Sequence, residues 1–505
     1  MSIKNDINKI LLKKFPHLEV NVVKYSEVKK DNKYFRIDSE PFKRSRLLFS
    51  KNIEYIKFSE IAIINPSKSE IYNLDENTHV TFLSMQNLGN GFINKQERGI
   101  IKDFIEGYTY FAENDILIAK ITPCMEHGKC AIARKLYNGI GFGSTEFNVF
   151  RIKDKRFSKE YIFSFLNREN IRQIAADNMV GTSGRQRVSK EFYENLLIPM
   201  FSKEFRLEIK AMVKDSHKAL ENSTKLYKEA EAILYEALGL DAENPLESIL
   251  SFGEENKIIH SLRLDGGNSK SYIVASPTYD LLKKYKGLNI SIRTYKESYL
   301  KTGRLDAEYY QVKYDLIENI IKDYYGGYDK LDISEIKDDN FIPNEKEKYR
   351  YIELANIING NITEPSEYLG ENLPTRARRK VRMGDLIISS VEGSLSSCAL
   401  ITEEFDNCIV STGFYVLKSN SINSETLLVI FRSELFQKYL NKFPSGTILS
   451  AISKDGLKNI LIPNLDLKTQ RKIEAKIQQS FELRDKSKEL LENAKVKIEE
   501  AIINS

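Results

Sequence analysis

The two halves of this chain have similar sequences, and this internal repeat constrains the fold more than any single motif. The segment LLKKF at residues 11–15 recurs as LLKKY at 281–285, and the segment at 21–38 recurs at 289–306 without a gap. Five more pairs follow in the same order at offsets of about 264 to 275 residues: KFSEI from Lys57 with the segment ending in ISEI at 333–336, DILIAKI from Asp115 with DLIISSV from Asp385, KCAIA from Lys129 with SCALI from Ser397, STEFNVF from Ser144 with STGFYVL from Ser411, and LLIP ending at Pro199 with ILIP ending at Pro463. Accidental recurrence of common strand and turn sequences would scramble this order. We therefore interpret the half-chain as a duplicated unit.

Each half has the pattern of a mixed α/β domain. Short runs rich in Ile, Val, Phe and Tyr alternate with Gly, Asn and Asp turn signals, as at residues 79–93 and 349–362, and predict strands. Apolar residues three and four apart predict amphipathic helices from Lys159 and from Ser424.

Each domain is followed by a segment without Pro or Gly, at 202–238 and 467–503, which predicts two long helices. Both carry a coiled-coil seam with several small residues: Phe205, Ile209, Met212, Ser216, Ala219, Ser223, Leu226, Ala230, Ile233 and Ala237 in the first, and Ile473, Ile477, Ser480, Arg484, Ser487, Leu491, Ala494, Ile498 and Ala501 in the second. A single helix of this kind would be expected to pack on its own domain. Two matched copies favour antiparallel pairing about a pseudo-twofold axis. The expected fold class is therefore an α/β (α+β) tandem repeat, with two globular domains separated by two long antiparallel coiled-coil helices.

Composition limits the class of protein further. The 505 residues contain 76 Lys and Arg against 71 Asp and Glu, so the net charge of +5 does not by itself indicate a nucleic-acid partner. The sequence has no signal peptide and no apolar run of roughly 20 residues, and its four cysteines fit a reducing compartment. A cytoplasmic protein without membrane contact is expected.

The predicted helices suggest a molecular ruler. A helix of roughly 35 residues spans about 50 Å at 1.5 Å per residue, which is comparable to one and a half turns of B-DNA. Two reading domains held apart by such helices would contact two separated half-sites. Because the two domains have diverged in sequence, those half-sites would differ.

Taken as an ordered set, the motifs resemble the specificity subunits of Type I restriction-modification systems, over nearly the whole chain. The segments that carry the resemblance are GSTEFNVFRI from Gly143, GTSGRQRVSKEFYENLLIP ending at Pro199, RLDAEYYQVKYD from Arg304 and LIPNLDLKTQRKIEAKI from Leu461. The resemblance implies two target-recognition domains that read a bipartite site in double-stranded DNA, at 1–201 and 281–465. It also implies two spacer helices, at 202–239 and 466–505, that bind two methyltransferase subunits. Motor-nuclease restriction subunits would join that assembly.

Two features depart from the family pattern. The first spacer begins MFSKEFRLEI where the second has Gln-Arg-Lys-Ile from Gln470, so the two helix starts are expected to dock differently. A polar connection at 240–280, which contains GGNSKS, is interpreted as a flexible linker or insertion.

The DNA-contacting residues are predicted from local charge and from the alignment of the two halves. The densest basic cluster, which precedes a predicted strand, comprises Arg376, Arg378, Arg379, Lys380 and Arg382. A solvated basic surface would give the same pattern. In the first half, the glycine-containing turn at 181–187 supplies Ser183, Arg185, Gln186 and Arg187, and its counterpart in the second half supplies Thr447. An ordinary helix-to-strand turn is the alternative. Lys120, Ser389 and Ser390 at aligned strand ends complete the set.

No catalytic signature is recognised, so no enzyme activity, cofactor or metal is expected. The chain has no phosphate-binding loop, no adenine-methyltransferase motif and no glycine-rich cofactor fingerprint. Asp38 with Glu40, and Asp306 with Glu308, are the pairs that a metal-dependent nuclease would need, but structural hydrogen bonds or salt bridges are favoured for them. Cys124, His127 and Cys130 lack a second ligand pair for zinc. The alternatives kept open are a stand-alone nuclease with an unrecognised site and a scaffold that does not bind DNA.

Overall fold

The structure of the chain is a computed structural model. It describes residues 10–11, 13–15, 25–26, 53–182, 186–247, 262–263, 269–270, 291, 293–331, 336–337, 340–446 and 450–504. Within these stretches, no helix has the length and apolar content needed to cross a membrane.

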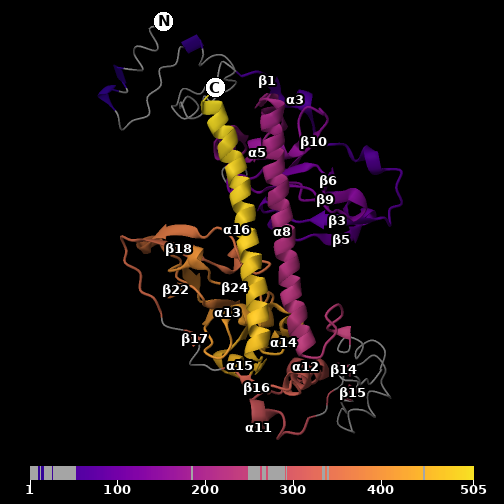
Figure 1. Cartoon of the computed structure of the whole chain (residues 1–505), viewed down its shortest axis with the longest axis vertical. Helices are drawn as coiled ribbons and strands as arrows, with labels where there is room; N and C mark the ends of the chain where they lie inside the picture. Colours follow the sequence, from indigo (N-terminus) through magenta and orange to yellow (C-terminus); the bar gives the residue numbers. More distant parts are fainter. Residues whose placement is uncertain are drawn as a thin grey trace. The chain divides into compact units, whose positions relative to one another are not determined.

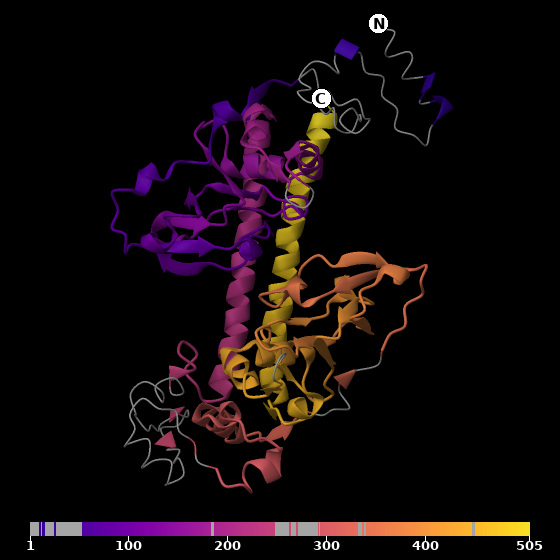
Figure 2. The same ribbon diagram turned by 180° about the vertical axis from the view of Figure 1, so that it is seen from behind.

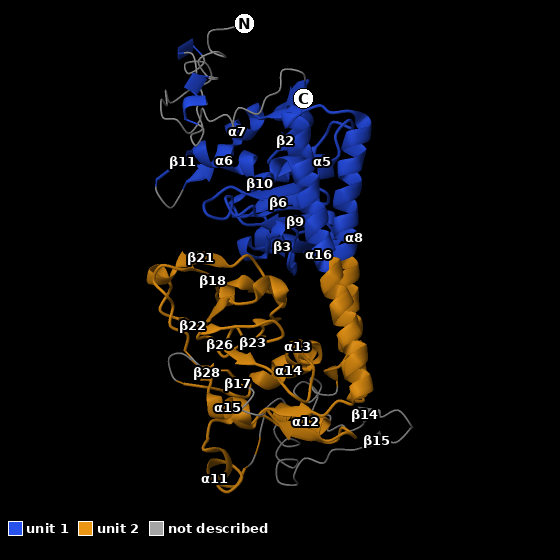
Figure 3. Cartoon of the chain, turned by 60° about the vertical axis from the view of Figure 1, so that its left-hand side comes forward, with its two compact units in different colours: residues 1–220, 484–505 blue, residues 221–483 orange. Residues whose placement is uncertain are grey.

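The chain forms two compact units (Figure 3). Unit 1 consists of residues 1–220 and 484–505, and unit 2 of residues 221–483. Each unit contains one globular domain, called domain 1 or domain 2 below, and a part of both long helices, α8 (Lys203–Ala237) and α16 (Leu467–Ile503). The two long helices predicted from the sequence are thus present. The domain boundaries predicted from the sequence stay a prediction, because the division into units falls within the helices.

Domain 1 contains two mixed sheets that share no strand, ordered β2-β10-β7-β8-β4 and β5-β3-β9-β6. Neighbouring strands are antiparallel except for β3 with β9 and β4 with β8. All four residues of β7 are buried, which explains why this segment is a continuous apolar run and not an alternating one. The strands of the two sheets are β2 (Ala62–Ile64), β3 (His79–Leu83), β4 (Asn90–Gly91), β5 (Glu97–Ile100), β6 (Thr109–Ala112), β7 (Ile116–Ala119), β8 (Cys130–Ile132), β9 (Ile140–Gly143) and β10 (Phe147–Ile152).

The helix predicted from Lys159 is present as two helices, α5 (Lys159–Leu166) and α6 (Glu169–Asp177), with a break at Asn167. Ser158 caps α5, since its hydroxyl accepts a hydrogen bond from the Tyr161 amide. The remaining short elements of domain 1 are β1 (Tyr55–Lys57), α3 (Phe58–Ile61), η3 (Lys68–Ile71), η4 (Met85–Asn87), α4 (Ile101–Phe104), η5 (Tyr137–Gly139), β11 (Met179–Val180), β12 (Arg187–Val188), α7 (Lys190–Asn195) and β13 (Leu197–Pro199).

Domain 2 repeats the two-sheet architecture, as the duplication predicts, although its first sheet has four strands where that of domain 1 has five. Its sheets are ordered β17-β26-β23-β24 and β21-β18-β25-β22, and β18 with β25 is again a parallel pair. The helix predicted from Ser424 is likewise split in two. The elements of domain 2 are β16 (Tyr328–Lys330), β17 (Ile336–Lys337), β18 (Lys348–Ile352), η8 (Leu354–Asn356), β19 (Ile357–Ile358), β20 (Asn361–Ile362), β21 (Ser366–Leu369), η9 (Gly370–Asn372), β22 (Ala377–Lys380), β23 (Leu386–Ser389), β24 (Cys398–Leu400), η10 (Glu403–Phe405), β25 (Ile409–Ser411), β26 (Phe414–Leu417), α13 (Ser424–Arg432), α14 (Glu434–Leu440), β27 (Pro444–Ser445), β28 (Ala451–Ile452), α15 (Lys454–Lys458) and β29 (Leu461–Pro463).

One buried carboxylate is repeated in both domains. Asp115 and Asp385, which begin the two aligned apolar strands, are both buried. Each carboxylate accepts a hydrogen bond from a backbone amide three residues earlier, at 2.8 Å. Each also pairs with a cation from another strand of its sheet, Asp115 with Arg151 on β10 at 2.7 Å and Asp385 with Lys337 on β17 at 2.6 Å. A buried carboxylate is retained in both copies because these partners compensate its desolvation.

The segment between the two repeats belongs in part to unit 2. Leu240 and Leu246 are buried in the core of domain 2, so this part of the predicted linker is packed. Most of 248–290 lies outside the described residues, apart from β14 (Leu262–Arg263) and β15 (Ser269–Lys270). Before β16, the chain forms α11 (Tyr299–Thr302), η6 (Ala307–Tyr310) and α12 (Val312–Lys322).

The long helices pair antiparallel within each unit, as predicted. In unit 1 the Ser216 hydroxyl donates to the Ser487 carbonyl at 2.7 Å, and in unit 2 the Ser480 hydroxyl donates to the Ser223 carbonyl at 2.9 Å. All four serines are fully buried. Figures 1 and 2 show α8 and α16 side by side within each unit. The two contacts are equivalent in the repeat, since Ser216 corresponds to Ser480 and Ser223 to Ser487.

The two helix starts dock at the same place, contrary to the expectation from their different sequences. Gln470 on α16 donates to the Ser421 carbonyl at 3.2 Å. Arg206, at the equivalent position of α8, donates to the equivalent carbonyl, that of Arg156, at 2.5 Å. The side chains differ, but both satisfy the backbone at the turn before α13 or α5.

We predict that Ser480→Leu destabilises unit 2, because a fully buried hydroxymethyl group would be replaced by a side chain that the close helix contact cannot hold. Overpacking of this kind costs about 1–3 kcal/mol. Gln479→Leu, at the neighbouring exposed position, is the matched control and should change stability little. Chemical denaturation followed by circular dichroism measures both. Equal unfolding midpoints for the two variants would contradict a tightly packed serine seam.

Candidate nucleic-acid interface

Each domain has a two-stranded hairpin near the end of a buried strand, β7 in domain 1 and β23 in domain 2. Hairpin 1 is β11 with β12, and hairpin 2 is β27 with β28. The first strand of each ends at a glycine in the left-handed region, Gly181 with φ of 127° and Gly446 with φ of 129°. A residue with a Cβ is disfavoured at such an angle, so the glycine in both copies is explained by backbone conformation.

In domain 1 the fold brings hairpin 1 against the end of β7. The Val188 amide donates to the Lys120 carbonyl at 2.9 Å, and the Lys120 amide donates to the Glu146 carbonyl at 2.9 Å. The Thr122 amide reaches the Gln186 carbonyl at 3.4 Å. Three of the residues predicted from sequence, Lys120, Gln186 and Arg187, therefore lie together.

Glu146 is a part of this cluster that sequence reasoning did not single out. Its carboxylate forms a bidentate pair with Arg187, with contacts of 2.8 Å and 2.5 Å. The hydrogen bonds from Arg187 hold the pKa of Glu146 below its usual range, against the smaller effect of burial. The same pair raises the pKa of Arg187. The repeat could have pointed to Glu146, because STEF at Ser144 aligns with STGF at Ser411 and the two halves differ only at this position of the motif.

In domain 2 the same backbone contacts recur with different side chains. The Ile452 amide of hairpin 2 donates to the Ser390 carbonyl at 2.7 Å, and the Ser390 amide donates to the Gly413 carbonyl at 2.9 Å. Gly413 thus takes the place of Glu146, and Ala451 takes that of Arg187. The ion pair of domain 1 has no counterpart at these positions in domain 2.

Ser389 and Ser390 are placed at this end of the domain, but their side chains are buried. The Ser389 hydroxyl lies 2.9 Å from that of Ser394, and the Ser390 hydroxyl donates to the Gly413 carbonyl at 3.0 Å. Both serines therefore fix the strand end, and their hydroxyls are already engaged.

The basic cluster lies along β22, an edge strand, and only one end of it is near hairpin 2. The Arg376 carbonyl accepts from the Thr412 amide at 2.8 Å, next to Gly413. Arg376 and Lys380 are exposed and Arg378 is half-buried. Among the described residues, no carboxylate lies within ion-pair distance of these three side chains. The strand in the equivalent position of domain 1, β6, has no basic residue.

The other two arginines of the cluster are already engaged within domain 2. The Arg379 guanidinium lies over the Tyr415 ring, 5.7 Å from its centroid, and the Tyr415 hydroxyl donates to the Ile452 carbonyl of hairpin 2 at 2.9 Å. Arg382, at the far end of β22, hydrogen bonds to Asn407 and lies 3.7 Å from the Asp406 carboxylate. Ser183, Arg185 and Thr447, which were predicted in the two hairpin turns, lie outside the described residues.

Of the carboxylates considered for metal-ion chemistry, Asp306 has another partner. Asp306 forms an ion pair of 2.5 Å with Arg304, and hydrogen bonding from that arginine lowers the pKa of Asp306. Asp38 and Glu40 lie outside the described residues. In the part of the chain that is described, no group of three or more His, Cys, Asp or Glu side chains is arranged to hold a metal ion. Burial raises the pKa of the Cys130 thiol, and that of Cys398 at the aligned position to about 12, as expected for two core cysteines.

Comparison with known proteins finds two relatives that match part of this chain. The chain is 34% identical over 193 residues to the Type I restriction enzyme EcoEI specificity subunit of Escherichia coli, and equally to the EcoAI specificity subunit of the same organism. Each match covers 37% of this chain and 31% of the relative, so the chain spans about a third of the length of these relatives. No protein-family model matches.

Among solved structures, the chain is similar to the S subunit of a Type I restriction-modification system from M. genitalium. The identity is 13%, and the match covers 90% of this chain and 96% of that one, with a TM-score of 0.33. Because this score is below 0.5, the fold class rests on the elements described above and not on the superposition. Over these 193 residues, the sequence matches to the two curated relatives confirm the resemblance predicted from the repeat and its motifs: this part of the chain is similar to the specificity subunits of Type I restriction enzymes.

Proposed function

We propose that this chain recognises a bipartite target in double-stranded DNA and directs partner adenine-methyltransferase and restriction subunits to it. The observation that carries the proposal is the pair of equivalent surfaces, each formed by a hairpin and a strand end, on two domains of the same architecture. Their backbone contacts are the same, while the side chains at the equivalent positions differ. A duplicated scaffold with divergent surfaces suits a reader of two different half-sites.

The side chains suggest how the two domains would share the task. In domain 1, Lys120 and Arg187 provide hydrogen-bond donors, with Glu146 orienting the Arg187 guanidinium. In domain 2, the cations of β22 provide phosphate contacts, with Arg376 next to hairpin 2. Domain 2 would therefore contribute more of the sequence-independent affinity, and specificity would come from the hairpins of both domains. Ser183, Arg185 and Thr447 belong to the proposed interface on sequence grounds alone.

The long helices are proposed to act as the spacer that sets the distance between the half-sites. Each is a single continuous helix, of 35 residues in α8 and 37 in α16, which is about 50 Å at 1.5 Å per residue. Their exposed faces are the proposed binding surfaces for two methyltransferase subunits, with motor-nuclease restriction subunits joining the complex. The chain itself would be non-catalytic and act in the cytoplasm, where chromosomal DNA is accessible.

Selection from a random pool of double-stranded DNA tests the proposed function. The full-length chain should enrich two short sequence blocks separated by an unread spacer. Exchange of residues 1–201 for the corresponding domain of another specificity subunit should change one block only. A pool without enriched sequences after repeated rounds would contradict the proposal. Magnesium-dependent cleavage of the pool by the chain alone would favour a nuclease.

A second prediction concerns phosphate contacts. Replacing Arg376, Arg378 and Lys380 together by Ala should lower affinity for all DNA sequences alike. It should also reduce the slope of log affinity against log salt by about 3, since each phosphate contact contributes about 0.9. Replacing Lys468, Arg471 and Lys472, three exposed cations at the start of α16, removes the same charge and is the control. An equal loss of affinity in both triple variants would show that net charge alone is responsible.

A third prediction concerns Glu146. Glu146→Gln removes a negative charge beside Lys120 and Arg187 and should raise DNA affinity by roughly threefold to tenfold at low salt. It should also weaken discrimination at the half-site of domain 1, because Arg187 loses its bidentate partner. Glu113→Gln, at the opposite end of β7, is the control with the same change in charge. Fluorescence anisotropy with specific and scrambled duplexes measures both effects, and unchanged discrimination would remove Glu146 from the site.

A further inference from the structure

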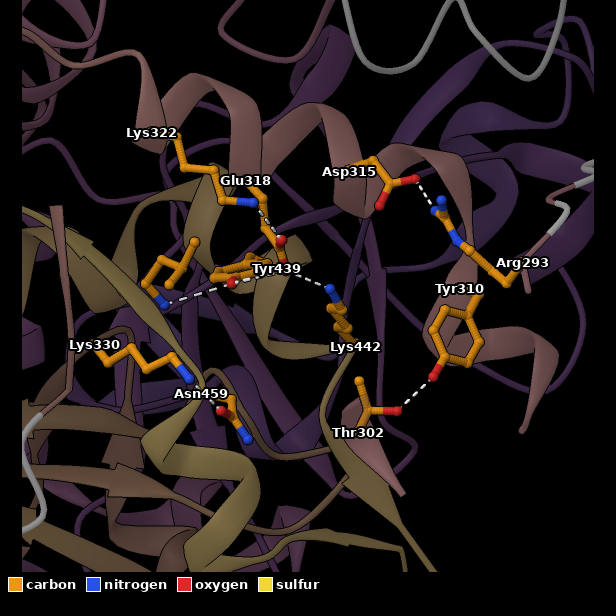
Figure 4. A network of polar contacts seen from close by, with 11 residues as sticks. Arg293, Thr302, Tyr310, Asp315, Glu318, Lys322, Lys330, Tyr439, Lys442 and Asn459 are labelled. Atoms are coloured by element: carbon orange, nitrogen blue, oxygen red, sulfur yellow. Dashed lines mark hydrogen bonds and ion pairs between the residues drawn. The ribbon is translucent and has the colours of Figure 1, made fainter. Parts of the chain in front are cut away.

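Hairpin 2 is held in place by a segment that precedes β16, the first strand of domain 2. This segment, residues 293–322, contains α11, η6 and α12, and we call it the brace. It contacts the stretch of chain that joins α14 to hairpin 2. Figure 4 shows Glu318 of the brace next to Tyr439, near the end of α14, and Lys442 of that stretch.

The contacts of Glu318 are largely removed from solvent. Lys442, with only 8% of its side chain exposed, forms an ion pair with Glu318. The Tyr439 hydroxyl donates to the same carboxylate at 3.3 Å. Burial acts to raise the pKa of Glu318, but the charges and hydrogen bonds of Lys442 and Lys322 together outweigh it, so the net pKa is lowered. The Lys442 ammonium also lies 4.8 Å from the centroid of the Tyr309 ring in the brace.

Arg304 makes the contacts closest to hairpin 2. Its guanidinium donates to two successive backbone carbonyls, those of Phe443 at 3.0 Å and Pro444 at 2.9 Å. Pro444 is the first residue of β27. The remaining donors form a bidentate pair with Asp306, at 2.8 Å and 2.5 Å, and the guanidinium lies over the Tyr309 ring at 4.6 Å.

The geometry of these contacts requires arginine. Four hydrogen bonds in fixed directions use the planar fork of the guanidinium, which a lysine ammonium cannot reproduce. Asp306 orients the fork, and Tyr309 covers its face. The second strand of hairpin 2, β28, is held by residues of domain 2. The Ile452 amide donates to the Ser390 carbonyl, and the Ile452 carbonyl accepts from the Tyr415 hydroxyl. The Arg304 contacts therefore add a restraint on the first strand, beside its pairing with β28.

We infer that Arg304 is a positioning residue for DNA recognition: the brace fixes the first strand of hairpin 2, so that this hairpin meets its half-site in a single orientation. The inference rests on the proposed function. It assigns a role in the reading surface to a residue that does not itself contact DNA. The motif RLDAE is thereby explained by a hydrogen-bond fork and not by metal-ion chemistry.

The test compares Arg304→Ala, Arg304→Lys and Asp306→Asn in the full-length chain. Hydrogen exchange should become at least about tenfold faster in peptides that cover residues 441–453 in Arg304→Ala, while α16 keeps its protection. Arg304→Lys should remain impaired because lysine lacks the fork, and Asp306→Asn should fall between it and the wild type. Arg156→Ala, which breaks a similar arginine–aspartate pair with Asp154 in unit 1, is the matched control. Unchanged exchange at 441–453 in Arg304→Ala would overturn the inference.

DNA selection with the same variants separates this inference from the proposed function. If the wild-type chain enriches two blocks, Arg304→Ala should lose roughly tenfold of its preference for the block read by domain 2 and keep its preference for the other. Equal preference for both blocks in wild type and Arg304→Ala would refute the positioning role and leave the proposed function intact. If the wild type enriches no block, the proposed function fails, whatever the exchange data show.

Discussion

Neither globular domain of this chain completes its core without apolar residues from both long helices. The core of domain 1 includes Ile209 and Val213 from α8 together with Leu491, Ala494 and Ile498 from α16. The core of domain 2 uses the equivalent residues of the opposite helices. In both units helix pairing joins distant segments, since the contacting serines are 271 residues apart in sequence in unit 1 and 257 in unit 2. Because apolar burial is the main favourable contribution to folding, helix pairing and domain folding are coupled in both units.

The small residues at the centre of the seam make this coupling geometrically possible. Serine at both crossing contacts allows the helix backbones to approach, and each hydroxyl satisfies a carbonyl or hydroxyl of the other helix. Close approach also occurs between domain 1 and α16. A Cβ on Gly91, whose φ is 100°, would lie 2.5 Å from the Leu491 side chain. Glycine is required there for both the backbone angle and the space.

Duplication has kept the buried interactions and changed the exposed ones. The buried carboxylates of Asp115 and Asp385, the seam serines and the glycines that begin the hairpin turns are the same in both halves. Glu146 and Arg187, in contrast, correspond to Gly413 and Ala451, and the neutral edge strand β6 corresponds to the basic strand β22. Stability constrains the first group of positions, while the second group is free to acquire new surface chemistry. This division is what a family of readers with different targets requires.

The sequence by itself determined the repeat, the two mixed α/β domains, both long helices and the residues of their seam, because these depend on local periodicity and on order along the chain. It also located the glycine-containing turns and the basic cluster. Only the tertiary structure decided that Arg187 pairs with Glu146, that Ser389 and Ser390 are buried, and that Arg379 supports a tyrosine. The same is true of Arg304, which lies 139 residues before the Phe443 carbonyl that it binds. Such contacts join residues that become neighbours only when the domains fold, and no local pattern in the sequence encodes that proximity.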